Sequence, residues 1–447
     1  MRIVVIGAVA AGTSAAAKAS RNDKSAEIVV YERDRFISYS GCGMPYFISG
    51  EVAARALYPR DAAFFKERYN VDIFTEHEVT AISPRDKTLR VKNLKDGTVF
   101  VDRYDKLIIA TGASAVAPPI KGMAQEQVFT LRALGDVLDI HTFIQEKKPR
   151  TAAIIGSGFI GLEMAESLHQ AGFSLSIIER MPQVMPIMDS EMTPPIEKQL
   201  KEKDVALYTG ISAAEIGPDA VALEDGRRIP ADLVLVSAGI RPNVSLAKDA
   251  GLIIGETGAI KVAPDMLTSD PDIYACGDCA EMFSALNGKP VWFPLGTTAN
   301  KTGRIAGDAV TGGDMRFRGV LGTSILRLFD LAIAQTGLTE RAAREQGYQV
   351  AVSHINKPAR ASYMQGGRMD IKTVADKETG RLLGVQIVGN DGVDKRIDVF
   401  VALLSFGAKA EDLEHLDLAY APPFSPTRDP VLYAGMVLDG ILKKEGD

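Results

Sequence analysis

Residues 151–180, TAAIIGSGFIGLEMAESLHQAGFSLSIIER, carry the pattern that is most informative about the fold of this chain. An apolar strand runs into Gly156, Gly158 and Gly161, which are spaced as G-x-G-x-x-G, and a helix and a second strand follow. Glycines at this spacing permit a tight turn and a close approach of the backbone to a pyrophosphate at the helix N-terminus. Glu179 ends the second strand, where a carboxylate accepts hydrogen bonds from ribose hydroxyls. The stretch therefore predicts a βαβ unit that binds a dinucleotide.

The charges at the end of the second strand favour one dinucleotide over another. The Glu179 carboxylate is expected to repel a 2′-phosphate, which favours NADH over NADPH. The neighbouring Arg180 keeps that preference moderate, since a guanidinium accepts a phosphate.

The N-terminus repeats the pattern in a looser form. Gly7 and Gly12 hold the outer glycine positions, Val9 replaces the middle glycine, and Glu32 lies 25 residues after Gly7. The repetition predicts two bound dinucleotides, or one site and its degenerate copy, and two αβ units without a ligand are the alternative. The elements expected here are a strand over 2–6, a helix over 13–20 and a strand over 27–31.

Further segments support the strand reading of the N-terminus. Residues 1–20 also mimic a secretory signal, but that alternative does not explain the matching second strand. Each unit is followed by a strand and a small-residue turn, YDKLIIATG at 104–112 and ADLVLVSAG at 231–239. A third segment, DIYACGDCAE at 272–281, brings Asp278 near the first glycine loop if the chain returns to the first unit.

Composition narrows the class of protein. The 447 residues are 46% hydrophobic and 24% charged, which suits two to four domains of about 150 residues and excludes collagen, coiled coil and disorder. A net charge of -6 gives no general field for a nucleic acid or an anionic membrane. No apolar run reaches the roughly 18 residues of a spanning helix, and three cysteines are too few for a secreted disulfide framework. A soluble, cytoplasmic protein is expected.

The order of these motifs resembles that of the pyridine nucleotide-disulfide oxidoreductases, flavoproteins that bind two dinucleotides. The resemblance covers essentially the whole chain and implies FAD on the first unit, with Glu32 at its ribose and Asp278 at its ribityl and pyrophosphate region, and NAD(P)H on the second. The implied fold is α/β, with two Rossmann-like domains and a C-terminal α+β dimerisation domain. The expected limits are 1–114 with 240–321 for FAD, 115–239 for NAD(P)H and 322–447 for dimerisation.

The resemblance also implies which residues hold the two cofactors. Phe159 and Glu163 are expected where hydride passes between nicotinamide and flavin, and in related enzymes an aromatic side chain at the first of these positions swings aside. The full set expected to bind the cofactors is Gly7, Ala10, Ala11, Gly12, Glu32, Arg33, Val79, Ala110, Thr111, Gly112, Gly156, Gly158, Phe159, Ile160, Gly161, Glu163, Glu179, Arg180, Gly239, Gly277, Asp278, Pro294, Leu295, Thr297 and Thr298.

Cys42 has the features of a reactive thiol. It lies in SYSGCGMPYFISG, residues 38–50, where Gly41 and Gly43 leave its sulfur uncrowded. A loop before a helix can aim amide donors at a thiolate and lower its pKa. Because no partner follows at the spacing C-x4-C, the thiol is expected to cycle through a mixed disulfide, a persulfide or a sulfenic acid. A packed, inert cysteine is the alternative.

Cys276 and Cys279 form C-x-x-C, a spacing found in zinc sites and redox dithiols. The chain has no second cysteine pair and its five histidines are scattered. We therefore expect two small buried residues and no metal.

A single active cysteine narrows the resemblance to coenzyme A-disulfide reductases, NADH oxidases, NADH peroxidases and NADH-dependent persulfide or polysulfide reductases. In the first group, two tyrosines of the partner subunit reach the cysteine; they correspond to Tyr363 and Tyr420, and a phenol can protonate a leaving thiolate. Ala10 stands where peroxidases place a histidine, so peroxide chemistry is disfavoured. Gly41 and Ser40 depart from the Asn and Ala usual in the first group.

The resemblance implies an FAD-dependent enzyme that passes electrons from NAD(P)H through Cys42 to a CoA-disulfide, a CoA-persulfide or a polysulfide. A homodimer with active sites that span both subunits is expected, and coenzyme A would bind as substrate or product. The residues expected to contact the substrate are Ser38, Ser40 and the basic Lys18, Arg21, Lys301 and Arg360. An NADH oxidase that reduces oxygen at the flavin is the nearest alternative, followed by a rubredoxin or ferredoxin reductase and by a redox sensor.

Overall fold

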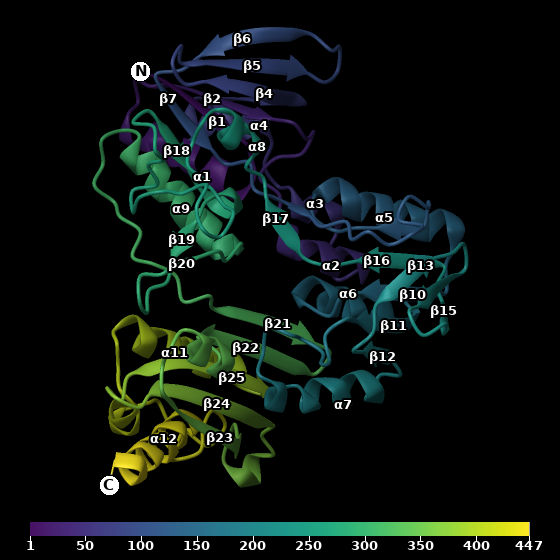
Figure 1. Ribbon diagram of the computed structural model, residues 1–447, viewed down its shortest axis with the longest axis vertical. Helices are drawn as coiled ribbons and strands as arrows, with labels where there is room; N and C mark the ends of the chain where they lie inside the picture. The colour runs from purple at the N-terminus through teal and green to yellow at the C-terminus, as the bar shows by residue number, and fades with distance from the viewer. Residues whose placement is uncertain (447) are drawn as a thin grey trace.

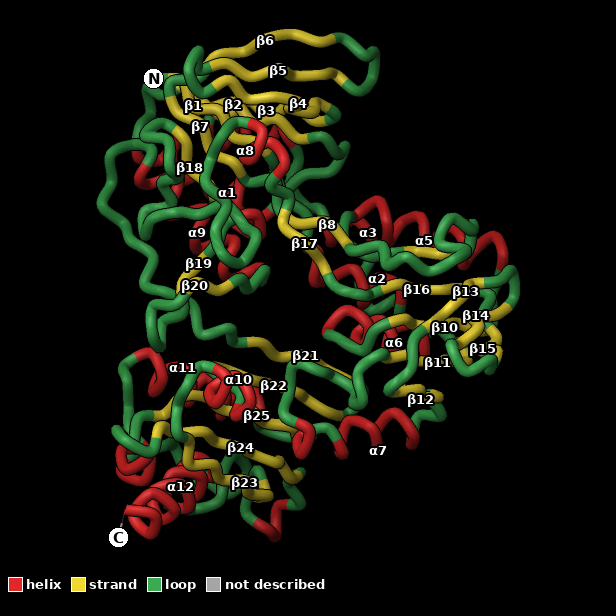
Figure 2. The backbone as a smooth tube through the Cα atoms, in the orientation of Figure 1, coloured by secondary structure: helices red, strands yellow, loops and turns green. Residues whose placement is uncertain are grey.

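The computed structural model describes residues 1–446, which form three lobes, each built on a five-stranded sheet (Figure 1). We call them the N-terminal, middle and C-terminal lobes. In Figure 2, helices flank the sheets of all three. Among residues 1–446, no helix has both the length and the apolar character needed to cross a membrane.

The sheet of the N-terminal lobe has the order β18-β7-β1-β2-β3, and all its neighbouring strands run parallel. Ile3, Val4 and Val5 of β1 are fully buried, which explains the continuous apolar run in the sequence. The late strand β18 pairs with β7, so the chain does return to its first unit. The elements are β1 (Arg2–Ile6), α1 (Ala10–Asn22), β2 (Glu27–Glu32), η1 (Gly41–Gly43), α2 (Met44–Ile48), α3 (Ala54–Leu57), α4 (Ala62–Tyr69), β3 (Val71–Thr75), β4 (His77–Ser83), β5 (Thr88–Asn93), β6 (Val99–Arg103), β7 (Lys106–Ile109), α8 (Ser245–Asp249), β18 (Ile273–Ala275), η3 (Gly277–Cys279), β19 (Met282–Phe283), β20 (Pro290–Val291) and α9 (Gly296–Ala309).

Helices α1 and α9 of this lobe pack with their backbones in close approach. A Cβ added at Gly303 would lie 2.3 Å from the carbonyl oxygen of Ala11, and one at Gly307 would lie 2.2 Å from that of Ala15. Because both contacts advance by four residues, the helices run in the same direction. The first turn of α9 therefore lies beside the first glycine loop.

The middle lobe repeats this plan. Its sheet has the order β12-β11-β10-β16-β9, again with all neighbouring strands parallel. Each of these two lobes also carries a three-stranded antiparallel sheet, β4-β5-β6 or β13-β14-β15. The elements are β9 (Val128–Phe129), α5 (Leu134–Lys147), β10 (Thr151–Ile155), α6 (Phe159–Gln170), β11 (Ser174–Glu179), η2 (Ser190–Met192), α7 (Pro194–Glu202), β12 (Ala206–Thr209), β13 (Ala213–Ile216), β14 (Ala220–Leu223), β15 (Arg228–Pro230) and β16 (Leu233–Val236).

A two-stranded ribbon joins the first two lobes where the chain crosses between them. It pairs β8 (Ala113–Ala115) with β17 (Ile240–Pro242) in antiparallel fashion. Asn243, which directly follows β17, stabilises the ribbon through side-chain hydrogen bonds to the β8 side. Its Nδ2 donates to the carbonyl of Thr111 at 2.9 Å, and its Oδ1 accepts from Ser114 Oγ at 2.8 Å.

The C-terminal lobe has an antiparallel sheet of order β21-β22-β25-β24-β23. Helices α11 and α12 share an apolar cluster with this sheet, in which Phe400 and Val431 are fully buried. The elements are β21 (Ser324–Leu328), β22 (Leu331–Gly337), α10 (Glu340–Glu345), β23 (Val350–Pro358), η4 (Ser362–Met364), β24 (Arg368–Asp376), β25 (Leu382–Gly389), α11 (Val393–Ser405), η5 (Ala410–His415) and α12 (Pro430–Gly446).

The largest apolar cluster crosses all three lobes. It contains Met44 and Leu57 of the N-terminal lobe, much of the middle lobe, and Leu326 and Leu328 of the C-terminal lobe. In Figure 1, α2 and α3 extend from the N-terminal lobe toward α5 and α6. The cysteine loop that precedes α2 is therefore fixed where the lobes meet.

Candidate active site

The two glycine loops have the same backbone geometry. Gly7 and Gly156 both adopt φ +104°, where a side chain is strained. A Cβ at Gly12 would lie 1.8 Å from the carbonyl oxygen of Gly7, and one at Gly161 would lie 2.1 Å from that of Gly156. These four glycines are required by the fold itself.

The middle position of each loop is different. A Cβ added to Gly158 meets no atom within 4 Å in the described structure, and the same position in the first loop holds Val9, which caps α1. The protein alone therefore does not require glycine at 158. Close approach of a pyrophosphate is a physical reason for it.

The carboxylates that end β2 and β11 are held in matching positions. Glu32 accepts the N–H of Ala8 at 2.7 Å and that of Asp34 at 2.9 Å. Glu179 accepts both the N–H and the Oγ–H of Ser157 at 2.8 Å. Burial raises the pKa of Glu32. Both carboxylates face a glycine loop, as binding to a ribose requires.

Asp278 supplies the clearest test of whether a dinucleotide fits the N-terminal lobe. It lies in η3, 9% exposed, and its Oδ2 pairs with Arg132. Within residues 1–446, its Oδ1 is buried without a hydrogen-bond partner. The preceding Gly277 has φ +76°, and a Cβ there would lie 2.7 Å from that of Ala11 in the first loop. The free Oδ1 of Asp278, which can accept a hydrogen bond, and the neighbouring glycine fit the hydroxyls of FAD.

Cys42 is exposed and lies in η1, directly before α2. Glu163 of the middle lobe and Asp278 of the N-terminal lobe both act electrostatically on its thiol, as does Arg132. The thiol therefore lies where the two glycine-loop units face each other.

The expectation of a lowered thiol pKa is wrong for this chain. Surrounding protein raises the pKa of Cys42, the charges of Glu163 and Asp278 raise it further, and Arg132 offsets part of the effect. Helix α2 spans only five residues, so it contributes too little dipole to reverse this.

Glu163 of α6 is a titratable group that acts on the thiol of Cys42. Burial and the nearby Glu166 raise the pKa of Glu163 to about 7. Its charge acts on Tyr46 of α2 as well as on Cys42. Arg327 of the C-terminal lobe stacks over the Tyr46 ring at 5.2 Å and pairs with Glu166 at 2.8 Å. The middle and C-terminal lobes therefore both contribute charges around α2.

The other residues expected to bind cofactors lie on the same loops, with one exception. Pro294 and Leu295 directly precede α9, and Thr297 and Thr298 lie in its first turn, which is beside the first loop. The side chain of Val79 is instead buried in the core with Leu89 and Val91. Residues at strand or helix ends beside the glycine loops are Ala10, Ala11, Arg33, Ala110, Thr111, Gly112, Phe159, Ile160, Arg180 and Gly239.

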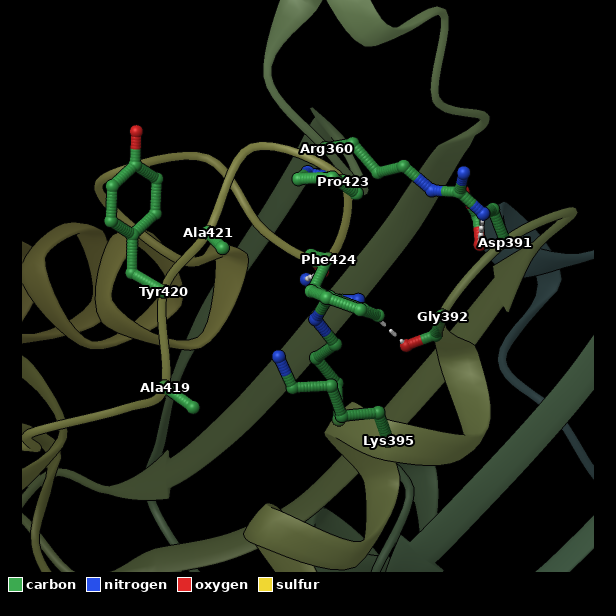
Figure 3. A pocket seen from close by; sticks show the side chains of 10 residues that line it. Arg360, Asp391, Gly392, Lys395, Ala419, Tyr420, Ala421, Pro423 and Phe424 are labelled. Atoms are coloured by element: carbon green, nitrogen blue, oxygen red, sulfur yellow. Dashed lines mark hydrogen bonds and ion pairs between the residues drawn. The ribbon is translucent and has the colours of Figure 1, made fainter.

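The two tyrosines expected near the thiol belong to the C-terminal lobe, where Tyr363 lies in η4 and Tyr420 between η5 and α12, whereas Cys42 belongs to η1 of the N-terminal lobe. Tyr363 is 71% exposed and Tyr420 is 50% exposed. Tyr420 lines a cavity of about 420 Å³, where Arg360 pairs with Asp391 at 2.7 Å. In Figure 3 its phenol projects from its loop away from that ion pair. Both tyrosines are free to meet another subunit.

Of the basic residues expected around a phosphorylated substrate, three lie on the packed helices α1 and α9 and the fourth lies in another lobe. Lys18 pairs with Asp308 at 3.0 Å, and Arg21 stacks on Tyr69 at 5.6 Å. Lys301 is exposed on α9, whereas Arg360 belongs to the C-terminal lobe.

The serines expected near the substrate lie close to the thiol in the sequence and the fold. Ser38 has φ +49° and donates its N–H to the carbonyl of Ala8 at 2.8 Å, which ties the cysteine loop to the first glycine loop. Ser40 is exposed and caps η1.

Cys276 and Cys279 are fully buried, as expected. Burial raises the pKa of both thiols. In the described chain, no cluster of three or more His, Cys, Asp or Glu side chains could hold a metal ion.

Two Rossmann-type units with one exposed thiol beside them are the arrangement of an oxidoreductase that binds two dinucleotides. Residues 1–303 match the family model "Pyridine nucleotide-disulphide oxidoreductase", and residues 324–430 match the dimerisation domain of that family. The chain belongs to the pyridine nucleotide-disulphide oxidoreductases, a family of FAD- and NAD(P)H-dependent enzymes, and it carries their dimerisation domain.

Relatives and solved structures match over the whole chain. The NAD(P)H coenzyme A polysulfide/persulfide reductase of Pyrococcus horikoshii is 37% identical over 442 residues, which is 98% of each chain. An NADH oxidase of Methanocaldococcus jannaschii is 34% identical and covers 97% of this chain and 98% of its own. The structure of an NAD-dependent persulfide reductase from A. fulgidus is 39% identical and has a TM-score of 0.96, over 100% of this chain and 84% of that chain.

Two residues of the site, Arg132 and Ser157, were not predicted from the sequence. Arg132 precedes α5, far from any motif, yet it pairs with Asp278. Ser157 lies inside G-x-G-x-x-G at a variable position, yet it holds Glu179. The serine between the two glycines was a usable signal, whereas the sequence gives no sign of the contact made by Arg132.

Proposed function

We propose that this protein is an FAD-dependent NAD(P)H oxidoreductase that reduces the S–S bond of a CoA-disulfide, a CoA-persulfide or a polysulfide through Cys42. The observation that carries the proposal is the exposed thiol at the meeting point of two dinucleotide units. A relative named for coenzyme A polysulfide and persulfide reduction supports the substrate class. The three unpaired thiols suit a reducing, cytoplasmic location.

The two cofactors would be held by the glycine loops and their carboxylates. Glu32 and Asp278 would bind hydroxyls of FAD, and Glu179 would bind ribose hydroxyls of NADH. When bound, FAD would supply a two-electron relay between the nicotinamide and sulfur. Phe159 and Glu163 line the first turns of α6, where the nicotinamide is expected.

Cys42 carries the sulfur chemistry. Its thiolate attacks one sulfur of the substrate S–S bond, and that bond breaks. A new bond joins Cys42 Sγ to the attacked sulfur, which gives a mixed disulfide written Cys42–S–S–R, and the other sulfur leaves as a thiolate that takes a proton. Two electrons from one NADH then break the Cys42–S–S–R bond and return the Cys42 thiolate and a second thiolate, which is also protonated. For a disulfide RSSR, the balance is NADH, one proton and RSSR giving NAD+ and two RSH.

The protons are proposed to come from Tyr363 and Tyr420 of the partner subunit. Both phenols are exposed in the lobe that carries the dimerisation domain, and a phenol stays protonated at neutral pH. Replacing Tyr420 by Phe is expected to slow disulfide turnover roughly tenfold or more without changing flavin reduction by NADH.

The second candidate function is an NADH oxidase that reduces oxygen at the flavin. The similarity to a relative of that name favours it. In that case Cys42 would be secondary to the reaction.

Replacement of Cys42 by Ser separates the two functions. Under the proposal, the variant reduces its flavin with NADH at the normal rate but loses turnover of CoA-disulfide and polysulfide by at least about a hundredfold. Oxygen consumption serves as the internal control. Retained disulfide turnover in Cys42→Ser contradicts the proposal, and fast oxygen consumption with negligible sulfur turnover in the unsubstituted protein favours the oxidase.

A further inference from the structure

A buried cluster of charges joins the middle lobe to the C-terminal lobe. Lys372 of β24 is 1% exposed, and its Nζ lies 3.0 Å from Asp189 and 2.8 Å from Glu340 and also pairs with Glu191. Asp189 and Glu191 belong to the middle lobe, and Glu340 belongs to α10. A buried cation is tolerated only where its partners are held in place. The cluster therefore fixes the segment that leads into η2.

Asp189 is the residue of this segment that the C-terminal lobe holds most closely. Its N–H donates to Gln386 Oε1 at 2.9 Å, and its Oδ2 accepts from Gln386 Nε2 at 2.5 Å and from the N–H of Glu340 at 2.9 Å. Three residues earlier, the carbonyl of Pro186 accepts from Arg341 Nη2 at 3.1 Å. The C-terminal lobe thus forms hydrogen bonds with both ends of the segment 186–189.

The same loop runs back to the ribose carboxylate of the second dinucleotide unit. Met181 donates its N–H to Glu179 Oε1 at 2.8 Å. Met185 donates its N–H to Ser157 Oγ at 3.2 Å, and that hydroxyl donates to Glu179 Oε2 at 2.8 Å. Met185 has φ +51° and is 1% exposed, so its conformation depends on the residues packed around it.

We propose that Asp189 is a positioning residue for the nicotinamide nucleotide. Gln386 and Lys372 hold Asp189 in place and so fix the loop formed by residues 181–189. The hydrogen bonds from Met185 to Ser157 and from Ser157 to Glu179 then orient the Glu179 carboxylate toward the ribose. The inference rests on the proposed function and deepens it. The C-terminal lobe sets the affinity of the middle lobe for NADH, besides carrying the dimerisation domain.

The test compares three single variants of the full-length, FAD-loaded protein. Gln386→Met removes the two-point contact with Asp189 while nearly keeping side-chain volume. Arg341→Met removes the surface contact with Pro186 and keeps the test informative should the buried variant fail to fold. Asp330→Asn is the matched control, because Asp330 also bridges the two lobes, to Lys203 at 3.2 Å, but does not touch the loop.

The measurement is anaerobic stopped-flow reduction of the flavin over a range of NADH concentrations. For Gln386→Met we expect the Kd for NADH to rise about five- to twentyfold, with a limiting reduction rate within about twofold of normal. For Arg341→Met we expect a rise of about two- to threefold, and for Asp330→Asn none. An unchanged Kd in Gln386→Met and in Arg341→Met overturns the inference.

A double variant separates positioning from general stability. In a Glu179→Gln background, Gln386→Met is expected to cause no further rise in Kd, because the affected carboxylate is already gone. An equal rise in both backgrounds would mean a merely structural role and overturns the inference. Absence of any flavin reduction by NADH in the unsubstituted protein overturns the proposed function and this inference together, whereas an unchanged Kd in a protein that is reduced overturns only the inference.

Discussion

The guanidinium of Arg132 pairs with one oxygen of Asp278 and leaves the other oxygen of that carboxylate buried without a partner among the described residues. Arg132 precedes α5 of the middle lobe, and Asp278 lies in η3 of the N-terminal lobe, so the pair bridges the two. A buried acceptor without a donor costs about 1–3 kcal/mol. A hydroxyl of FAD would remove that cost.

Asp278→Asn is expected to weaken FAD binding about 10- to 100-fold, because an amide is a poorer acceptor than a carboxylate. The only tryptophan, Trp292, donates its Nε1–H to the carbonyl of Asp278 at 2.8 Å, so its fluorescence should report FAD binding at this site. Titration of that fluorescence with FAD checks the affinity. Asp272→Asn, a change in the same segment that affects only contacts with Lys87 and Lys106, is the control and should bind FAD normally.

Glu163→Gln is expected to make Cys42 more reactive. The Glu163 charge raises the pKa of the thiol, so its removal should increase the thiolate fraction at pH 8 and the rate of alkylation by iodoacetamide, roughly three- to tenfold. The reverse result is expected for Arg132→Met, since Arg132 lowers that pKa. Equal alkylation rates in all three proteins would contradict this electrostatic account.

Ionisation of Glu163 should also make the stability of the folded protein depend on pH. Burial raises the pKa of Glu163 from 4.5 to about 7, so the folded state prefers its protonated form. The stabilisation is fully present below pH 4.5 and is lost as the pH rises through 7, by at most about 3 kcal/mol. Glu163→Gln should remove this loss, seen as a smaller fall in Tm between pH 5 and pH 8. The exposed Glu224→Gln should keep the normal profile, and a normal profile in Glu163→Gln as well would count against the assignment.

Two glycines of the second loop should respond differently to alanine. At Gly161 the new Cβ would collide with the carbonyl oxygen of Gly156, so Gly161→Ala is expected to destabilise the fold by about 2 kcal/mol or more. At Gly158 the Cβ has room, so Gly158→Ala should keep its Tm within about 2 °C and lose affinity for NADH roughly tenfold or more. Thermal melts and NADH titration check both. Normal NADH affinity in Gly158→Ala would argue that no pyrophosphate approaches this loop.

Local patterns predicted the nucleotide-binding units well. The strand expected over 2–6 is β1, with the same limits, because a buried parallel strand reads as a continuous apolar run. The helix expected over 13–20 extends over 10–22, since the alanines at its start favour helix. The domain limits at 114, 239 and 321 stay a prediction.

Contacts between residues far apart in the chain could not be predicted from the sequence. The pKa of Cys42 depends on Glu163 and Arg132, which lie about a hundred residues away and carry no local signal. Lys372 reads as an ordinary charge on a strand, yet it is buried among carboxylates from two lobes. Tyr363 and Tyr420 were identified by resemblance alone, and their role needs a second subunit, which one chain does not contain.

The most direct test of the role of Cys42 follows one thiol through the reaction by intact mass. The FAD-loaded protein is incubated with CoA-disulfide, freed of excess reagent and then given one equivalent of NADH without oxygen. We expect one CoA adduct per chain, absent in Cys42→Ser, and its full release as one equivalent of free thiol on addition of NADH. Oxidation of NADH that leaves the adduct on Cys42 unchanged would contradict the account.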